Sequence, residues 1–303
     1  MGKVWEAFGP KDGDSWLRQV VTAPAMYAFV GLAAWVQVHG WDSSGGRLAT
    51  WFAARSGTEQ ALVSVGAVLA AATATSVVSG MAPAVLRGLE GYWPRPLEWL
   101  RERLIRRHSE RAEKWNDELK ALQDEEANRE LTPAERRKFV RLDLTLRRIP
   151  TRSEARMPTR IGNILRAAEC WPRDKYGLDA VIVWPRLWLV LRGGTRDEIG
   201  DARAGLDQAI CGLVWGVLLA LWGLVALWAV GVAIIVAAFF YRRIVTAAED
   251  YGDLVEAAFD LERAELYRQL RAPLPPTSDL EPAEGAALTQ YLWRGIGSIR
   301  FEK

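Results

Sequence analysis

The sequence predicts an all-α integral membrane protein with four transmembrane helices and a helical cytoplasmic module. The main observation is that residues 209–241 contain no charged side chain, although about 18 apolar residues already suffice to cross a bilayer. Two more uncharged stretches, 19–38 and 60–86, are also long enough to span. Charged residues are concentrated between these stretches, so apolar and charged segments alternate along the 303-residue chain.

The first apolar stretch, 19–38, is predicted to be transmembrane helix 1. A cleaved secretory signal over 1–38 is the alternative. The preceding leader is long and of mixed charge, and no A-x-A-like cleavage site follows the stretch, which favours an uncleaved span. Residues 60–86 are predicted to form transmembrane helix 2.

The third apolar run, 209–241, is too long for one span. As a single helix its 33 residues would reach roughly 50 Å, against a hydrocarbon core of about 30 Å. A turn in the zone rich in Gly and Trp at 223–231 would divide it into transmembrane helix 3 at 208–225 and transmembrane helix 4 at 229–246. One long tilted helix is the alternative.

Charge placement predicts the topology. Residues 87–207 hold 26 Lys and Arg, whereas the loop 39–59 holds two, so the long segment is expected in the cytoplasm and the loop outside. The N-terminal segment 1–18 is basic and is also predicted to be cytoplasmic. Arg242 and Arg243 follow the last apolar run directly, which places the C-terminus inside and requires an even number of spans. We therefore expect a multi-pass protein of the plasma membrane, the inner membrane of a bacterium.

The segment 87–207 is predicted to be a cytoplasmic helical domain. Helical spacing of apolar residues and capping residues predicts four helices: 96–124, 133–149, 161–171, and one that starts at Thr195 with Glu198 and runs into span three. The second opens with a capping box formed by Thr132 and Glu135. Its residues 140–146 also alternate between apolar and polar, which is a strand period, but the capping box favours a helix.

The remainder of the chain is predicted to continue as a helix and then to become a proline-containing linker. Apolar spacing predicts a cytoplasmic continuation of helix 4 over 247–272. Three prolines then open a linker, so that 273–303 comprises a proline linker and a short C-terminal amphipathic element.

The segment 181–191 is unusually apolar for a soluble domain, with Arg186 as its only charge. An apolar run of this length is more often a core segment than a span. The alternative is an element at the cytoplasmic leaflet, with Trp184, Arg186 and Trp188 at headgroup level.

The second span is rich in small residues, which permit close approach between helices. Packing within the chain is the simplest interpretation. The alternatives are an oligomer interface, or a pore lined by hydroxyl-bearing residues: Thr73, Thr75, Ser76 and Ser79.

Four segments carry a family resemblance: LEGYWP at 89–94, MPTRIGNILRAAE at 157–169, YGLDAVIVWPRLW at 176–188 and AAEDYGDLVEAAFDL at 247–261. Together they resemble a family of uncharacterised polytopic bacterial membrane proteins from high-GC genomes. The resemblance covers roughly 90–261 and implies a polytopic protein with a cytoplasmic helical module. It implies no catalytic or binding residue.

Polar residues beside apolar neighbours in these segments are candidates for locking the module together. They are Asn163, Glu169, Asp179 and Arg186. We expect them to pair with one another and to fasten the Trp-rich segment to the short helix, because an unpaired buried charge is costly.

No enzyme is predicted. The chain lacks the P-loop, HExxH, GxSxG, GxGxxG and CxxC motifs, and its two cysteines and two histidines are too scattered for a metal site, so neither cofactor nor metal is expected. Residues 87–207 also hold 21 acidic residues, for a net charge of only +5, so nucleic acid is an unlikely partner. The arginines near the spans are expected to meet anionic lipid headgroups.

These features predict a non-enzymatic oligomeric membrane protein. Its cytoplasmic helical module would control a transmembrane pore or perturb the bilayer, as a component of a bacterial stress or defence response. No Asp, Glu, Lys, Arg or His lies in the uncharged stretches 19–38, 60–86 and 209–241, which argues against a proton-coupled transporter but is compatible with a passive pore. The expected partners are the lipid bilayer and further copies of the chain. The alternative is a membrane anchor or scaffold that docks a soluble cytoplasmic partner, and an enzyme comes third.

Overall fold

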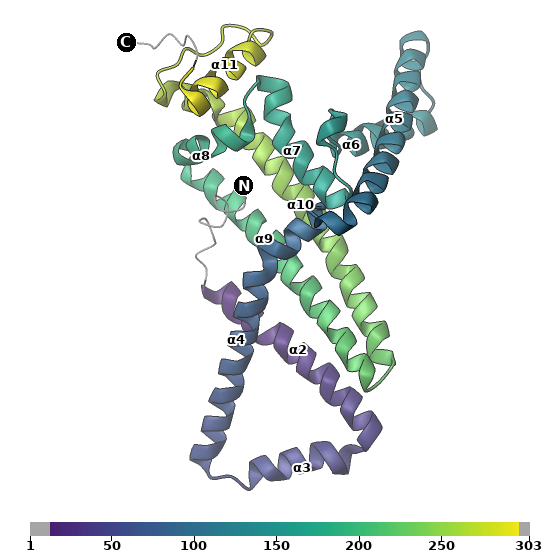
Figure 1. Cartoon of the computed structure of the whole chain (residues 1–303), viewed down its shortest axis with the longest axis vertical. Helices are drawn as coiled ribbons and strands as arrows, with labels where there is room; N and C mark the ends of the chain where they lie inside the picture. The colour runs from purple at the N-terminus through teal and green to yellow at the C-terminus, as the bar shows by residue number, and fades with distance from the viewer. Residues whose placement is uncertain (1–12, 297–303) are drawn as a thin grey trace. The chain divides into compact units, whose positions relative to one another are not determined.

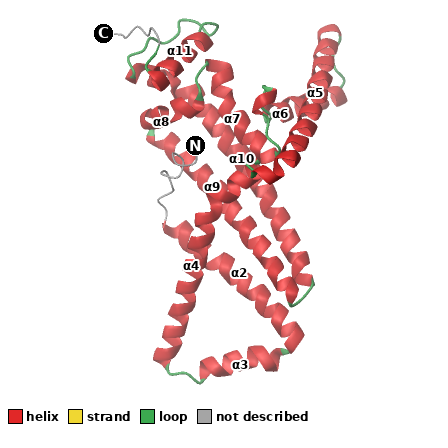
Figure 2. Ribbon diagram, in the orientation of Figure 1, coloured by secondary structure: helices red, strands yellow, loops and turns green. Residues whose placement is uncertain are grey.

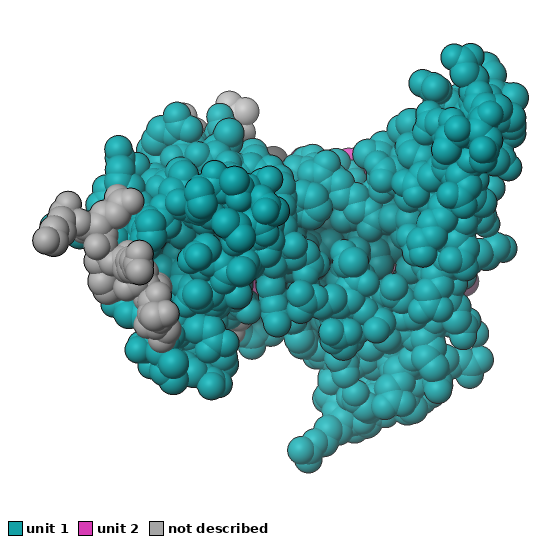
Figure 3. Space-filling model, turned by 90° about the horizontal axis from the view of Figure 1, so that it is seen from above, with its two compact units in different colours: residues 1–8, 87–203, 245–303 teal, residues 9–86, 204–244 magenta. Residues whose placement is uncertain are grey.

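A computed structural model describes residues 13–296, and the described chain is built from helices, with no strand in that range (Figures 1 and 2). The predicted all-α class is confirmed. The described residues form two compact units, coloured separately in Figure 3. Unit 1 comprises 87–203 and 245–296, and unit 2 comprises 13–86 and 204–244. Most of the predicted N-terminal segment 1–18 lies outside the described residues.

Unit 2 carries the apolar stretches. Its helices are α2 (Gly13–His39), α3 (Trp41–Ala53), most of α4 (Gly57–Glu90), the end of α9 (Gly193–Leu218), η3 (Leu219–Leu224) and the start of α10 (Trp228–Gln269). Three helices are long and apolar enough to span a membrane: α4, α9 extended by η3, and α10. The predicted first span lies in α2, which is not among these three. The predicted loop 39–59 contains a helix, α3.

The apolar run 209–241 is not one helix. α9 ends at Leu218, and η3 and a short turn precede α10. Glycine allows the two long helices to pack closely: a Cβ on Gly212 would lie 2.2 Å from the Phe240 ring, and one on Gly216 would lie 3.0 Å from Val236. Gly212 and Gly216 therefore form a small-xxx-small face against α10, the arrangement that favours close packing of apolar helices.

The α2 helix packs against this hairpin through aromatic residues. The Tyr27 ring lies 5.7 Å from the Trp215 ring and 5.5 Å from the Trp222 ring. Trp222 also approaches Gly31 so closely that a Cβ there would overlap its ring. The indole N–H of Trp228 donates to the Gln37 side chain, which gives the polar end of this tryptophan a partner.

The first part of α4 is exposed along its whole circumference. Every residue from 61 to 70 is exposed, and the first buried residue of α4 is Thr75. Many of these exposed side chains are large and apolar, including Leu62, Val65, Val68 and Leu69. Contiguous apolar exposure on this scale indicates a surface that is covered by lipid or by protein.

Unit 1 holds the charged helices: η1 (Arg95–Leu97), α5 (Glu98–Asn128), α6 (Pro133–Arg147), η2 (Ser153–Ala155), α7 (Arg160–Tyr176), α8 (Ala180–Val190) and α11 (Glu281–Arg294), together with the remaining parts of α4, α9 and α10. The predicted start at Thr195 was wrong, since α9 begins at Gly193. The continuation of the last span beyond residue 247 is confirmed as helix to Gln269.

The α5 and α6 helices form a hairpin. The predicted capping box is present: the Thr132 hydroxyl accepts from the Glu135 N–H, and the Glu135 carboxylate accepts from the Thr132 N–H. Arg129 donates to both oxygens of Glu135 at 2.9 Å and closes the turn. This pairing lowers the pKa of Glu135 to about 2. Between the two helices lies an apolar cluster of Leu119, Leu122, Leu131 and Leu142, flanked by Trp115, Phe139 and Leu146.

The Trp-rich segment is a core element. α8 runs through Pro185, and its Trp184, Leu187 and Trp188 are buried. The Trp184 ring lies 5.8 Å from Phe259 of α10. Its apolar length is thus used for packing within unit 1, in agreement with the first of the two interpretations of 181–191.

The start of α7 is tied to the end of α4. The Thr159 hydroxyl donates to the Leu89 carbonyl at 2.6 Å and accepts from the Gly162 N–H at 2.9 Å. A Cβ on Gly162 would fall 2.1 Å from the Glu90 carbonyl oxygen, so only glycine permits this approach. The motif PTRIGN therefore forms a joint between two helices.

Glu90, at this joint, has a perturbed carboxyl. Burial, and then the negative charge of Glu169, raise its pKa from 4.5 to about 7. Because the folded pKa exceeds the unfolded one, the folded state loses stability as pH rises from 4.5 to 7. Glu90→Gln is therefore expected to raise the thermal midpoint at pH 8, by an amount corresponding to roughly 1–3 kcal/mol.

Circular dichroism of the detergent-solubilised chain at pH 4 to 8 tests this prediction. Wild type and Glu90→Gln should converge near pH 4, separate between pH 4.5 and 7, and stay a constant amount apart at higher pH. Glu102→Gln, at an exposed position of α5, is the matched control and should follow wild type at every pH. A constant difference between Glu90→Gln and wild type across the range would contradict the prediction.

The α11 helix docks on α7 through two glycines. A Cβ on Gly285 would fall 1.9 Å from the Tyr176 carbonyl oxygen, and Gly177 has a φ of 70°, in the left-handed region. Beside them, the Thr289 hydroxyl accepts from the Asp179 N–H at 3.1 Å. Gly285→Ala should destabilise unit 1 by roughly 1–3 kcal/mol, because the backbones must separate.

Limited proteolysis and thermal unfolding measure this effect, with earlier cleavage expected in the proline linker 273–280. Gly200→Ala is the control: that helical glycine has no atom within 4 Å of its would-be Cβ. It should be neutral or stabilising by up to about 1 kcal/mol. Equal behaviour of the two variants would disprove the proposed role of Gly285.

Candidate functional site

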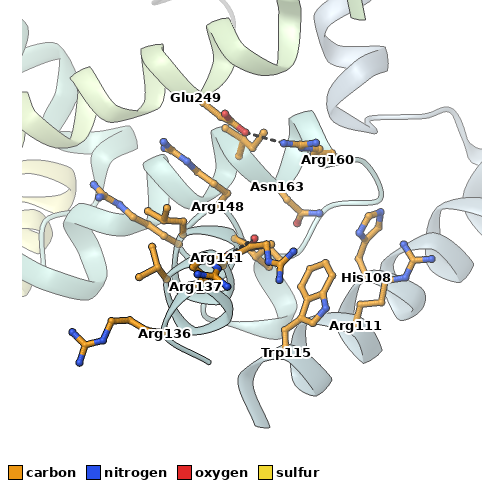
Figure 4. Close-up of a pocket in the computed structure, with 16 residues that line it drawn as sticks. His108, Arg111, Trp115, Arg136, Arg137, Arg141, Arg148, Arg160, Asn163 and Glu249 are labelled. Atoms are coloured by element: carbon orange, nitrogen blue, oxygen red, sulfur yellow. Dashed lines mark hydrogen bonds and ion pairs between the residues drawn. The ribbon is translucent and has the colours of Figure 1, made fainter. Parts of the chain in front are cut away.

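A concave site within unit 1 is a cavity of about 870 Å³ (Figure 4). Side chains from α5, α6, α7, α10 and the segment after α6 line it. Seven are arginines: Arg111, Arg136, Arg137, Arg141, Arg147, Arg148 and Arg160. Glu249 is the only acidic residue among the lining side chains. A cavity of this size is typical of small-molecule sites.

The α6 helix supplies one wall with a mixed stripe. Arg137, Val140, Arg141 and Leu144 recur at three- and four-residue spacing, which places them on one face of a helix. Val140 and Leu144 are 50% and 57% exposed, unusually open for aliphatic side chains. This wall therefore offers guanidinium groups and bare apolar surface side by side.

The α5 helix supplies a second part of the lining, which also combines a guanidinium group with apolar surface. His108, Arg111 and Trp115 follow at three- and four-residue spacing on one face. Burial, and then the positive charge of Arg111, lower the pKa of His108, so its imidazole is neutral at pH 7. Trp115 packs on the apolar cluster of the hairpin and also contributes to the cavity lining.

A row of carboxylates on α10 neutralises part of this positive charge. Glu249, Asp253 and Glu256 lie at four- and three-residue spacing, on one face of the helix. Arg160 donates to Glu249 at 3.1 Å, the pair drawn with a dashed line in Figure 4. Arg148 donates to both oxygens of Asp253 at 2.6 Å, and Arg147 donates to Glu256 at 2.7 Å.

Three lining arginines remain without an ion pair among the described residues: Arg111, Arg137 and Arg141. Arg136 pairs with the exposed Glu126 at 3.5 Å. The cavity therefore carries an excess of positive charge, although unit 1 as a whole is of mixed charge. Guanidinium groups bind phosphate and carboxylate oxygens in bidentate fashion, so this arrangement is suited to an anionic ligand.

The sequence-predicted locking residues each bond to a group outside their own set. Asn163, which lines the cavity, accepts from the Met157 N–H and donates to the Met157 and Thr159 carbonyls. Glu169 pairs with Arg166 at 2.9 Å, and Asp179 caps α8 by accepting from the Val181 N–H. Arg186 is exposed and donates to the Ile182 carbonyl. The expected pairing of these four residues with one another is therefore not observed, because each satisfies a local backbone or side-chain group.

The hydroxyl-bearing residues of α4 lie in unit 2, and three of them, Thr73, Ser76 and Ser79, are exposed. Thr73 and Thr75 donate to the carbonyls of Leu69 and Ala71 in their own helix. Ser79 lies 4.0 Å from the Cys211 sulfur, between α4 and α9.

Sequence reasoning did not find the cavity. No motif distinguishes arginines that line one cavity from arginines that are dispersed over a surface, and the sequence predicts only lipid headgroups as contacts, for the arginines near the spans. A usable indication was present in α6, where two arginines and two aliphatic residues share one face although a solvated face needs no aliphatic residues. Among the described residues, no group of three or more His, Cys, Asp or Glu side chains is placed to hold a metal ion.

Comparisons with protein-family models, with curated proteins and with solved structures gave no match to this chain.

The ion pair between Arg147 and Glu256 can be tested by mutation. Glu256 is buried, and burial raises the pKa of its carboxyl although Arg147 opposes the shift. Arg147→Ala leaves this carboxyl without its charged partner and should destabilise unit 1 by roughly 1–3 kcal/mol. Glu256→Gln in the Arg147→Ala background should recover part of the loss, since it removes the buried charge.

A double-mutant cycle by chemical unfolding in detergent measures the coupling. Arg152→Ala serves as control: it breaks the Arg152–Asp174 pair, in which the arginine is exposed to a similar degree but the acid is less buried. Strict additivity of Arg147→Ala and Glu256→Gln would show that this contact contributes nothing.

Proposed function

We propose that the chain is a membrane receptor whose helical module binds a phosphate-bearing anion in the arginine-lined cavity. The observation that carries the proposal is the set of three exposed arginines, Arg111, Arg137 and Arg141, that line one cavity without a carboxylate partner among the described residues. Guanidinium groups without a carboxylate partner are available to donate charge-assisted hydrogen bonds to an anion. In the proposed topology this module is cytoplasmic, with both termini inside and four spans.

The proposed output is a change in the membrane. α10 is a single helix that contributes residues 228–244 to the apolar unit and 245–269 to the module. Its carboxylates bind the cavity arginines Arg147, Arg148 and Arg160. An anionic ligand competes with these carboxylates, so occupancy alters the contacts of the helix that also forms the last span. We propose that an oligomer of the chain opens a passage, or perturbs the bilayer, in response.

A scaffold function is the second candidate. Val140 and Leu144 are exposed beside Arg137 and Arg141, so the same face of α6 suits a partner segment that is acidic and apolar. This alternative predicts a chain that is monomeric or dimeric in mild detergent, and whose membrane activity does not respond to small anions.

Binding of inorganic tripolyphosphate to the full chain in nanodiscs of neutral lipid tests the primary proposal. Isothermal titration calorimetry should detect binding that weakens with added salt. Arg137→Gln and Arg141→Gln should each weaken it about tenfold, because each removes a charge-assisted hydrogen bond. Arg106→Gln, an exposed arginine on the opposite face of α5, is the matched control and should leave affinity unchanged.

Dye release from proteoliposomes tests the output. Tripolyphosphate should alter release from wild-type vesicles but not from vesicles carrying the Arg137→Gln, Arg141→Gln double variant. Absence of binding refutes the receptor proposal. Binding without any change in release, from a chain that is monomeric by native mass spectrometry, refutes the coupling and favours the scaffold.

A further inference from the structure

A simple oxoanion leaves most of the cavity unexplained. Two or three guanidinium groups suffice to hold one phosphate group, yet the volume is about 870 Å³, toward the upper end of the usual range for small-molecule sites. The remaining lining is largely apolar: Trp115, Val140, Leu144, Ile149 and Ile164. The ligand therefore needs an anionic part and a sizeable apolar part.

The aromatic residue adjoins the cationic ones. Arg111 and Trp115 are one turn apart on α5, so both project from the same face of that helix. The indole is half-buried and packs against the cluster that contains Leu119 and Leu142, which restricts its movement. A fixed aromatic face next to guanidinium groups is the combination that proteins use to stack a base and hold its phosphates.

Resting on the proposed anion site, we infer that the cavity binds a nucleotide. Arg137 and Arg141, one turn apart on α6, take the phosphate oxygens. Trp115 stacks on the base, and Val140 and Leu144 cover the apolar edge of the ligand. A ligand that consisted of phosphate alone would not explain why Val140 and Leu144 are exposed beside these arginines on α6.

The shape of the site favours a small ligand over a lipid surface. Side chains from α5, α6, α7 and α10 line a concave, half-open cavity, whereas a bilayer contacts convex or flat faces. Long nucleic acid is also disfavoured. Four of the seven lining arginines are already paired with carboxylates, and a backbone track would need a stripe of unpaired charge.

Titration of the full chain in phosphatidylcholine nanodiscs with ATP, GTP and inorganic tripolyphosphate tests the inference. The three probes share a triphosphate, so any difference reports the nucleoside. We expect ATP and GTP to bind about tenfold more tightly than tripolyphosphate, because stacking on an aromatic residue contributes at that level.

Substitutions at Trp115 separate stacking from packing. Trp115→Leu keeps apolar volume against the leucine cluster but removes the aromatic face, so it should abolish the preference for nucleotides and leave tripolyphosphate affinity unchanged. Trp115→Phe should keep part of the preference. Trp99→Ala is the matched control, since Trp99 is 63% exposed on the opposite face of the same helix. Circular dichroism confirms that each variant is folded.

The outcomes are distinct. Equal affinities for all three probes, with arginine dependence intact, would overturn the nucleotide inference and leave the anion site standing. No binding of any probe would overturn both. Tighter binding to phosphatidylglycerol vesicles or to a single-stranded oligonucleotide than to ATP, lost in Arg137→Gln, would assign the arginines to a lipid surface or to nucleic acid and overturn the inference.

Discussion

The arrangement of unit 1 depends on the ion pairs between the α10 carboxylates and the arginines around α6 and α7. α10 presents Glu249, Asp253 and Glu256 along one face, and Arg160, Arg148 and Arg147 meet them in that order. Glu256 is buried, so its charge is tolerable only with a partner. These contacts hold the cavity wall against the longest helix of the chain. The carboxylates of α10 therefore compete with any anionic ligand for these three arginines.

This competition relates the affinity of the ligand to its effect on the contacts of α10. A ligand anion that binds Arg147 or Arg148 must displace a carboxylate, and this displacement lowers the net affinity of the ligand. No carboxylate has to be displaced for the ligand to bind Arg111, Arg137 or Arg141. A ligand can shift an equilibrium only by its differential affinity for the two states. The unpaired arginines therefore supply binding, and the paired ones supply the link to α10.

Sequence patterns predicted α5 and α6 of unit 1, because the determinants of these two helices are local. The capping box at Thr132 and the apolar spacing of 96–124 depend on residues within one or two turns, and both are present as expected. The motifs PTRIGN and YGLD are explained by helix packing and not by a catalytic or binding role. PTRIGN joins α7 to α4 through Thr159 and Gly162, and Gly177 at the end of α7 admits α11.

What the sequence could not reveal are the convergent features. The cavity arginines come from positions 111 to 160 and their partners from 249 to 256, and no local pattern relates the two sets. The expected mutual pairing among Asn163, Glu169, Asp179 and Arg186 failed for the opposite reason, since each found a partner within six residues of its own position. Because short-range hydrogen bonds satisfy these four side chains, the side chains do not need to pair with one another.

The hydroxyls of α4 have a consequence for assembly. Thr73 and Thr75 return their hydrogen bonds to carbonyls of their own helix. In a bilayer these two intrahelical bonds keep both hydroxyls satisfied, whichever lipid or helix lies beside them. Close packing of its small side chains would then help to select the neighbours of this helix in the membrane.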